Sequence, residues 1–329
     1  MMRLPKFTYV VPRTIGEAVR MMGDAGASGQ FVAGGTDLYP NMKRRQQTPR
    51  TVISVGRIPE LHRIEGDGKA GLRIGAGVSL TDIVEHPVVN RDYPAVARAA
   101  RLISTPTLRN MGTVGGNLLL DTRCNYYDQN FEWRKGVNFC LKKDGDVCWV
   151  APGSEKCWAV QSADLVPLMV AIGARLRLVS TVGDRLVEAR GFYNDDGIDY
   201  LHKRPDELLA EIQLPPADGW RAVYKKLRRR GAFDFPVLGV AARLDFENGT
   251  VKDARVVLGG IAPAPLEVES ASKALVGNQF DEESMRAAAE ACYFRARPLD
   301  NTDYLMNYRK QMARPFVLRA LEELRQSLV

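Results

Sequence analysis

Four of the five cysteines of this 329-residue chain follow one another at gaps of 16, 8 and 9 positions. They are Cys124, Cys140, Cys148 and Cys157. Four thiolates are the ligand set of a structural zinc ion or of a 4Fe–4S cluster. The spacing is neither the paired C-x-x-C of a zinc ribbon nor the compact cysteine run of a ferredoxin. Metal-free thiols are a third interpretation, and the residues alone leave all three open.

Two glycine pairs have the composition of an anion-binding loop. One is in "AGGTDL" (33–38), between a predicted strand and a predicted helix, and the other is in "TVGGN" (113–117). Because glycine has no Cβ, backbone N–H groups can approach a phosphate closely, and a helix N-terminus adds partial positive charge. Neither segment fits the G-x-G-x-x-G or the P-loop pattern. We predict that the two loops hold a pyrophosphate between them.

Helix and strand signals alternate in the first 56 residues. "TIGEAVRMMGD" (14–24) begins with Thr14 and has Glu17 three positions later, which is the capping-box pattern of a helix start. Short apolar strands are predicted at 31–33 and 51–55. This alternation is typical of an α/β unit.

A second region follows. Residues 71–80 predict a strand and 93–104 a helix, whereas "SADLVPLMVAIGARLRLVS" (162–180) predicts a short helix that leads into a strand. The apolar pattern of this last segment resumes after the cysteine-bearing stretch.

The third region begins near residue 217. "RAVYKKLRR" and "FPVLGVAARLDF" predict strands, and Asn248-Gly249 predicts a hairpin turn into "KDARVVLGGI". Helical patterns are found at 268–276, 281–295 and 302–327. The fifth cysteine, Cys292, lies among alanines of the second helix and is predicted to be a small core residue.

Composition excludes several classes of function. The net charge is +7, but we find neither a recognisable nucleic-acid-binding fold nor a basic stripe with stacking aromatics, so no nucleic-acid partner is expected. The sequence contains no apolar run of about 18 residues, so no membrane span is predicted, and no secretory signal is apparent. We expect a cytoplasmic protein. The three histidines are scattered and no G-x-S-x-G occurs, so no catalytic residue is predicted.

Five stretches, in this order, carry a family resemblance. They are "FVAGGTDLYP" with "LRNMGTVGGNL", then "SADLVPLMVAIGARLRL", "DELLAEIQLP" and "YKKLRRRGAFDFPVLGVAA". The chain resembles the FAD-binding medium subunit of the xanthine oxidase (molybdenum hydroxylase) family over almost its whole length. The resemblance implies an α+β fold class: a vanillyl-alcohol-oxidase-type (PCMH-like) FAD-binding fold in two α/β subdomains, at 1–56 and 57–216. A C-terminal α+β domain of the CO dehydrogenase flavoprotein type would occupy 217–329.

The resemblance also implies which residues contact FAD. The first loop would contribute Ala33, Gly34, Gly35, Thr36, Asp37 and Leu38, and the second Thr113, Gly115, Gly116 and Asn117. Asp164 would lie near the adenosine and Leu209 against the isoalloxazine. Lys226 would lie near the flavin ring, where a cation stabilises the reduced, anionic flavin.

The cysteines fall in an insertion relative to other family members, at about 121–160. Asn117 and Asp164 are 47 positions apart, where the family has a short link. A loop of this length needs something to hold it. One branch, the 4-hydroxybenzoyl-CoA reductases, resembles this chain in an insertion that binds a 4Fe–4S cluster. The resemblance is closest to the beta subunit of that branch, and it makes the four cysteines cluster ligands.

The implied function is electron transfer. FAD and the 4Fe–4S cluster would relay electrons between a ferredoxin-type donor and two partners, a large molybdopterin subunit and a small subunit with 2Fe–2S clusters. The assembly would be a dimer of heterotrimers that dehydroxylates 4-hydroxybenzoyl-CoA or a similar aromatic acyl-CoA. The alternative is the FAD subunit of an aldehyde, CO or purine hydroxylase, with a structural zinc in the insertion.

Overall fold

The N-terminal segment forms a small parallel sheet in the computed structural model, which describes residues 3–327. Its strands are β1 (Thr8–Val10), β2 (Gly29–Val32) and β3 (Thr51–Ser54), in the order β1-β3-β2. The helices between them are α1 (Ile15–Ala25) and α2 (Leu38–Lys43). The hydroxyl of Thr14 accepts the N–H of Glu17 at the start of α1, as the capping pattern predicts. The predicted α/β unit is therefore confirmed.

A five-stranded antiparallel sheet follows, in the order β4-β5-β8-β6-β7. Its strands are β4 (Ile64–Asp67), β5 (Gly71–Gly75), β6 (Arg175–Ser180), β7 (Gly183–Glu188) and β8 (Leu208–Leu214). The helices of this region are α3 (Leu80–Glu85), α4 (Pro87–Asp92), α5 (Pro94–Arg101), α6 (Pro106–Arg109), α7 (Val114–Leu118) and α9 (Leu165–Ile172). Every residue of α9 is buried, so this helix is the centre of the largest core.

The third sheet is antiparallel, in the order β12-β11-β10-β9. Its strands are β9 (Trp220–Leu227), β10 (Leu238–Glu247), β11 (Thr250–Gly259) and β12 (Leu266–Glu267). The helices α10 (Glu269–Leu275), α11 (Glu282–Arg295) and α12 (Met306–Gln326) cover one face, and α9 packs against the other. Asn248 and Gly249 both have positive φ, which confirms the predicted hairpin turn.

Shared cores join the three sheets. Ala18 and Val19 of α1 pack against β6 and β8 of the second sheet, and α9 connects the second sheet to the third. The sheets lie within 8–54, 64–214 and 220–267. The boundaries of separate domains, at residues 56 and 216, stay a prediction.

Local backbone geometry corrects several predicted helix ends. The helix predicted at 93–104 ends at Arg101, because Ser104 has a φ of 50° and Pro106 begins α6. The helix predicted from 302 begins at Met306, after Tyr304 with a φ of 68°. β4 and β7 were not predicted, because both are short and mostly exposed edge strands. Cys292 is fully buried beside α12, as expected of a core residue.

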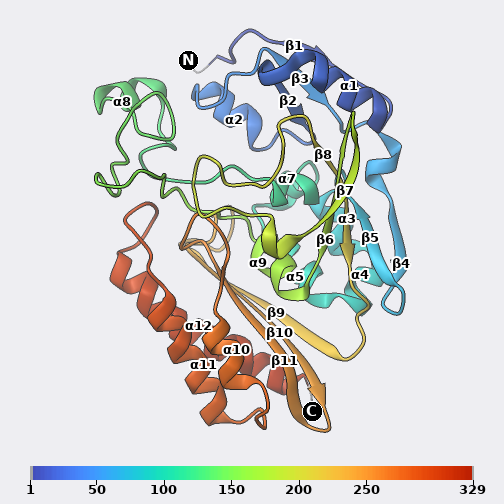
Figure 1. Cartoon of the computed structure of the whole chain (residues 1–329), viewed down its shortest axis with the longest axis vertical. Helices are drawn as coiled ribbons and strands as arrows, with labels where there is room; N and C mark the ends of the chain where they lie inside the picture. Colours follow the sequence, from blue (N-terminus) through green and yellow to red (C-terminus); the bar gives the residue numbers. More distant parts are fainter. Residues whose placement is uncertain (1–2, 328–329) are drawn as a thin grey trace.

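The cysteine-bearing stretch has little regular structure. Within it the structure contains the helix α8 (Phe131–Gly136), which lies at the outer edge of the molecule near α2 (Figure 1). Arg123 and Val160 form an isolated antiparallel bridge that closes the stretch at its base. This geometry makes it an excursion of the chain that leaves the fold and returns at one point.

Candidate functional site

The two glycine loops touch each other. A Cβ built on Gly34 would lie 1.6 Å from the carbonyl oxygen of Met111, so only glycine permits this approach. Gly35 has a φ of 71° and lies against the ring of Tyr39. The structure therefore brings together the loops that the sequence predicts to act together, although they are almost 80 positions apart (Gly34 and Gly112).

Close packing also fixes the second loop. The Thr113 hydroxyl accepts the N–H of Gly116 at 3.0 Å and caps α7. Gly115 donates to the carbonyl of Ala76 at 2.9 Å, and the N–H of Ala76 donates to Ala210 of β8. A Cβ on Gly115 would lie 2.6 Å from that of Ala76. This loop is thus anchored to the second sheet through backbone groups.

Asn117 connects the second loop to the central helix. Its Oδ1 accepts the N–H of Leu165, the first residue of α9, at 3.1 Å. Within residues 3–327, the side-chain amide nitrogen of Asn117 donates no hydrogen bond. Asn117 therefore positions α9 and keeps its donor for another group.

Asp164 and Lys226 form a buried ion pair. Their side chains are 3 % and 1 % exposed, and Lys226 Nζ lies 3.0 Å from Asp164 Oδ2. Tyr224 donates its hydroxyl to Asp164 Oδ1 at 2.9 Å, and Lys226 also donates to the carbonyl of Leu102. Burial raises the pKa of Asp164 and lowers the pKa of Lys226, while their mutual attraction opposes both shifts.

The ion pair brings together two residues that the family resemblance assigns to FAD. The resemblance implies Asp164 near the adenosine and Lys226 near the flavin ring, and their side chains lie 3.0 Å apart. Both roles stay predictions. Leu209 of β8 is 2 % exposed and belongs to the largest core, so its contact with the isoalloxazine stays a prediction.

The remaining first-loop residues line the approach to α2. Thr36 is exposed, Ala33 is half-buried, and Leu38 is buried in a small core under α2. Asp37 accepts from Asn41 at 2.9 Å and forms an ion pair with Arg123 of the insertion. The Arg123 guanidinium also stacks over Phe235, 4.5 Å from its carbon to the ring centroid. Arg123 therefore joins the insertion to the first glycine loop.

All four clustered cysteines surround one narrow cavity and are buried. Its other walls include Tyr126, Tyr127 and Trp149, whose rings limit the access of water. The N–H of Ala159 donates to the Cys157 sulfur at 3.4 Å. The N–H groups of Tyr127 and Lys143 donate to the backbone carbonyls of Cys124 and Cys140, at 3.0 and 2.8 Å. Amide donors to sulfur are an arrangement that stabilises thiolates bound to iron.

Burial makes these thiols weak acids. It raises the pKa of Cys124 to about 12 and that of Cys157 to about 11, and it also raises the pKa of Cys140. A metal must therefore displace a proton from each thiol that it binds. Protonated, metal-free thiols account for the burial equally well, so burial alone does not distinguish them from metal ligands.

The positions of the cysteines can be compared with the geometry of a zinc site and of a 4Fe–4S cluster. Within residues 3–327, no group of three or more His, Cys, Asp or Glu side chains is placed to hold a single metal ion. A tetrahedral zinc site brings sulfurs to about 3.8 Å from each other, from a Zn–S distance of about 2.3 Å. A 4Fe–4S cluster holds its thiolates farther apart, because each binds a different iron. The cavity measures only about 10 Å³, so the thiols have to move outward to admit such a cluster.

The insertion packs against the basic segment after α2. Gln46 donates to the carbonyl of Tyr127 at 2.5 Å, and Gln47 to Asp121 at 3.0 Å. Arg134 of α8 is fully buried and donates to the carbonyls of Arg44 and Arg45 at 3.0 and 3.1 Å. The insertion is therefore held in place by hydrogen bonds from its neighbours, with the cysteines at its centre.

Three charged residues of the insertion escaped the sequence analysis: Arg123, Arg134 and Lys142. Arg123 precedes Cys124 directly, and Lys142 follows Cys140 by two positions. Charged side chains this close to candidate ligands are a signal that could have indicated a role beside them. The sequence did not predict that these three side chains are buried, because lysine and arginine are usually exposed.

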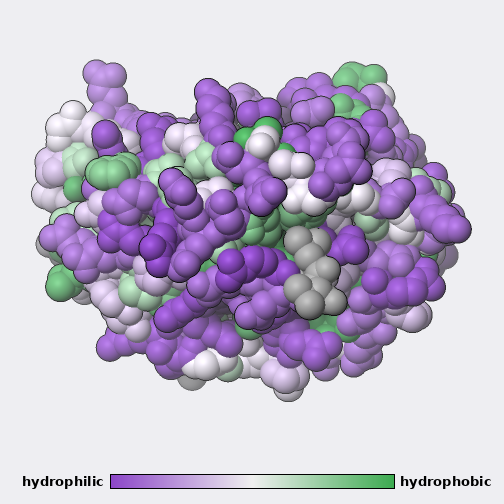
Figure 2. All heavy atoms as spheres, turned by 90° about the horizontal axis from the view of Figure 1, so that it is seen from below, coloured by the Kyte–Doolittle hydropathy of each residue, from purple (hydrophilic) through white to green (hydrophobic). Residues whose placement is uncertain are grey.

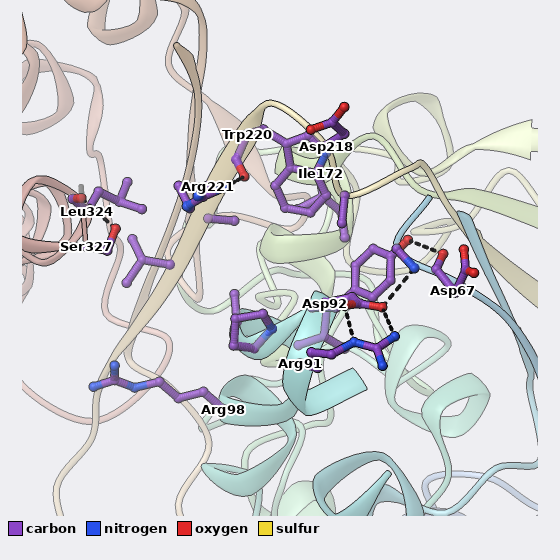
Figure 3. Close-up of a pocket in the computed structure, with 18 of the residues that line it drawn as sticks. Asp67, Arg91, Asp92, Arg98, Ile172, Asp218, Trp220, Arg221, Leu324 and Ser327 are labelled. Carbon is purple, nitrogen blue, oxygen red and sulfur yellow. Dashed lines mark hydrogen bonds and ion pairs between the residues drawn. The ribbon is translucent and has the colours of Figure 1, made fainter. Parts of the chain in front are cut away.

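A larger cavity lies between the second and third sheets (Figure 3). It measures about 1050 Å³, and Tyr93 and Trp220 line it. Two of its arginines are paired with carboxylates, Arg91 with Asp92 and Arg98 with Glu323. The third, Arg221, donates to the carbonyl of Trp220. No residue of either glycine loop, and none of the cysteines, lines it. The end of the molecule shown in Figure 2 is mostly hydrophilic, with apolar side chains in small separate areas.

Comparisons with known proteins identify the family. Residues 5–217 match the FAD binding domain in molybdopterin dehydrogenase, and residues 222–324 match the CO dehydrogenase flavoprotein C-terminal domain. The carbon monoxide dehydrogenase medium chain of Hydrogenophaga pseudoflava is 31% identical over 318 residues, which cover 96% of each chain. The aldehyde oxidoreductase FAD-binding subunit of Escherichia coli K12 is 32% identical over 93% of this chain and 96% of its own length.

A solved structure agrees. The carbon monoxide dehydrogenase of H. pseudoflava that lacks the Mo-pyranopterin moiety matches with a TM-score of 0.80 and 30% identity, over 98% of both chains. The chain therefore belongs to the FAD-binding medium subunits of the molybdenum hydroxylase family. The predicted fold class is confirmed, and FAD is the cofactor of this family's first domain. No helix within residues 3–327 combines the length and the apolar character needed to cross a membrane.

The loop contact predicts a strong effect of Gly34→Ala. The added methyl would overlap the Met111 carbonyl, so the two loops have to separate. We expect the variant to lose most of its flavin, measured by absorbance of the purified protein, and about 2 kcal/mol or more of stability. Gly153→Ala is the control, because nothing lies within 4 Å of its added Cβ. A Gly34→Ala variant with full flavin content would contradict the role of the contact.

The buried ion pair predicts strong coupling between its partners. Lys226→Met leaves a buried carboxylate without its cation, and we expect it to lower the free energy of unfolding by about 3–5 kcal/mol. Adding Asp164→Asn should restore part of that loss. Lys252→Met removes an exposed pair with Glu247 and should cost less than about 1 kcal/mol. Urea unfolding of these three variants and of Asp164→Asn alone measures these differences, and additive losses in the double variant would contradict direct coupling.

Proposed function

We propose that this chain transfers electrons through FAD within a molybdenum hydroxylase of the CO, aldehyde or xanthine type. The observation that carries the proposal is the direct contact between the two glycine loops, in a fold shared with the medium chains of such enzymes. FAD, when bound, exchanges two electrons and can pass them on singly. The chain supplies the binding site and the orientation of the cofactor.

The contacting loops form the cradle for the diphosphate and ribityl parts. Their backbone N–H groups and the free amide nitrogen of Asn117 supply donors, and the glycines allow close approach. The residues proposed for this role are Ala33, Gly34, Gly35, Thr36, Asp37, Leu38, Thr113, Gly115, Gly116 and Asn117. The Asp164–Lys226 pair marks one end of the cofactor, where the buried ammonium contributes positive potential.

The four cysteines form the proposed site of a 4Fe–4S cluster in this subunit. Four buried thiols around one cavity supply the full ligand set, and the N–H of Ala159 donates to the Cys157 sulfur. A single structural zinc is the alternative. No group of three ligands among residues 3–327 is placed around one ion, so the thiols have to move to bind either metal centre. A cluster would add a one-electron centre to the chain.

The partners follow from the same family. Relatives are named medium chains, which fits an assembly with larger and smaller subunits. We propose a large molybdopterin subunit and a small 2Fe–2S subunit, in a dimer of heterotrimers. The cytoplasmic location expected from the sequence stays a prediction.

A second candidate function is the reductive dehydroxylation of 4-hydroxybenzoyl-CoA or a similar aromatic acyl-CoA. The convergence of four cysteines on one cavity favours it. A ferredoxin-type donor would deliver the electrons, and the exposed rings of Phe131, Trp133 and Trp149 offer it an apolar contact near that cavity. These rings are 37–40 % exposed.

The purified complex discriminates between the two functions. We expect oxidation of CO, an aldehyde or a purine with an artificial acceptor such as a quinoid dye. Reduction of 4-hydroxybenzoyl-CoA by reduced methyl viologen, without oxidation of the other substrates, would replace the first function with the second. The substrate pocket belongs to a partner chain, so the assay requires the whole complex.

Cys140→Ser tests the metal site. We expect the anaerobically purified protein to contain about four iron and four sulfide per flavin, and the variant to lose most of both while it keeps FAD, since the two sites use different loops. Cys292→Ala, which changes a buried cysteine outside the cavity, should keep both. Loss of flavin together with iron in Cys140→Ser would show that the insertion is part of the flavin site.

A further inference from the structure

A lysine is buried in the wall of the cysteine cavity. The side chain of Lys142 is 6 % exposed, and its Nζ donates to Asp121 Oδ1 at 2.8 Å, Thr122 Oγ1 at 2.7 Å and Gly197 O at 2.5 Å. The rings of Tyr127 and Tyr200 lie around it, 4.8 and 5.2 Å from the nitrogen to their centroids. All three donors of the ammonium are used, so its position is fixed.

The Lys142 ammonium binds a residue that packs against Cys157. Gly197, whose carbonyl it binds, packs so closely on Cys157 that an added Cβ would lie 2.8 Å from the sulfur. Lys142 also lines the cavity that all four cysteines line. The lysine charge therefore lies beside the four sulfurs.

A second buried cation acts on a different cysteine. Arg134 is fully buried, and its Nε and Nη1 have no hydrogen-bond partner among the residues that the structure describes. Asp144 is the nearest carboxylate, 3.7 Å from Nη1, and the Phe139 ring lies beside the guanidinium. Phe139 directly precedes Cys140, and its ring centroid is 5.9 Å from the guanidinium carbon, so the Arg134 charge lies near that cysteine. The unused donors of the buried guanidinium leave it free to respond to negative charge at the cavity.

We propose that Lys142, supported by Arg134, sets the reduction potential of the centre bound by the four cysteines. The proposal rests on the 4Fe–4S site proposed above. Four thiolates around an iron–sulfur core already carry net negative charge, and reduction adds one electron without breaking a bond. A buried cation lowers the free energy of this more negative state and raises the potential. The physical effect is large here because low exposure limits screening by water and salt.

Asp121 acts in the opposite sense. Its Oδ2 accepts from Tyr127 at 2.8 Å and from Gln47 at 3.0 Å, and its Oδ1 binds Lys142. The carboxylate is thus one step farther from Cys157 than the ammonium and partly offsets it. Replacing the anion should raise the potential, whereas replacing the cation should lower it. Opposite shifts from adjacent residues distinguish electrostatic tuning from a general disturbance of the site.

The experiment is a redox titration of the purified holoenzyme, followed by the electron paramagnetic resonance of the reduced cluster. At a fixed solution potential, we expect Lys142→Met to lower the ratio of reduced to oxidised cluster at least tenfold. This change corresponds to a reduction potential lower by about 59 mV for a one-electron couple. Asp121→Asn should shift the potential upward, and Lys142→Arg should stay near the wild type. Lys143→Met, the neighbouring lysine at 32 % side-chain exposure, is the control and should not shift it.

Each result has one meaning. A Lys142→Met potential equal to that of the wild type, at full iron and flavin content, overturns the tuning role while the cluster itself stands. If the Lys142→Met enzyme does not assemble, Asp121→Asn provides the test. A cluster potential in Asp121→Asn equal to that of the wild type then overturns the tuning role. An enzyme without iron in the cysteine site contradicts the proposed cluster first and the tuning role with it, and iron analysis separates that case from the others.

Discussion

The architecture depends on the contact between the two glycine loops. The backbone at Gly34 lies against the Met111 carbonyl at a distance that no side chain allows, and this contact joins the small parallel sheet to the second sheet. Because Gly115 is in turn bonded to Ala76 and through it to β8, the cradle is connected to the core by backbone hydrogen bonds. A cofactor held there is oriented by the whole fold rather than by a mobile loop.

The same region organises the insertion. Asp37, a residue of the first loop, pairs with Arg123, and the residue after Arg123 is the first cavity cysteine. Gln46, Gln47 and Arg134 hold the rest of the excursion against the segment after α2. The flavin cradle and the cysteine cavity are therefore neighbours joined by one ion pair, which suits electron transfer between the groups that they bind.

Local signals in the sequence predicted much of the fold. Thr14 and Asn248-Gly249 specify their cap or turn through a side chain or φ values, and each has the expected structure. The helix ends near Ser104 and Tyr304 were wrong, because both residues have a positive φ, which a helix does not accommodate. The edge strands β4 and β7 lack the apolar alternation that makes a strand recognisable.

The candidate site was predictable only in part. Residue type and spacing indicated the glycines and the cysteines, since few residues can substitute for either chemistry. The pairing of Asp164 with Lys226 was not predictable, because it joins residues 62 positions apart through the packing of α9 on β9. The buried positions of Lys142 and Arg134 escaped for the same reason: burial of a cation is a property of the assembled fold.

X-ray absorption at the iron and zinc edges of the anaerobically purified protein tests whether the four cysteines bind a 4Fe–4S cluster. We expect iron with a first shell of sulfur alone and a strong iron–iron contribution, which is the signature of a cluster bound by four thiolates. Zinc with four sulfur ligands, or a flavoprotein whose insertion holds no metal, would contradict it. In either of these cases the cysteines would serve the fold of the insertion and not the transfer of electrons.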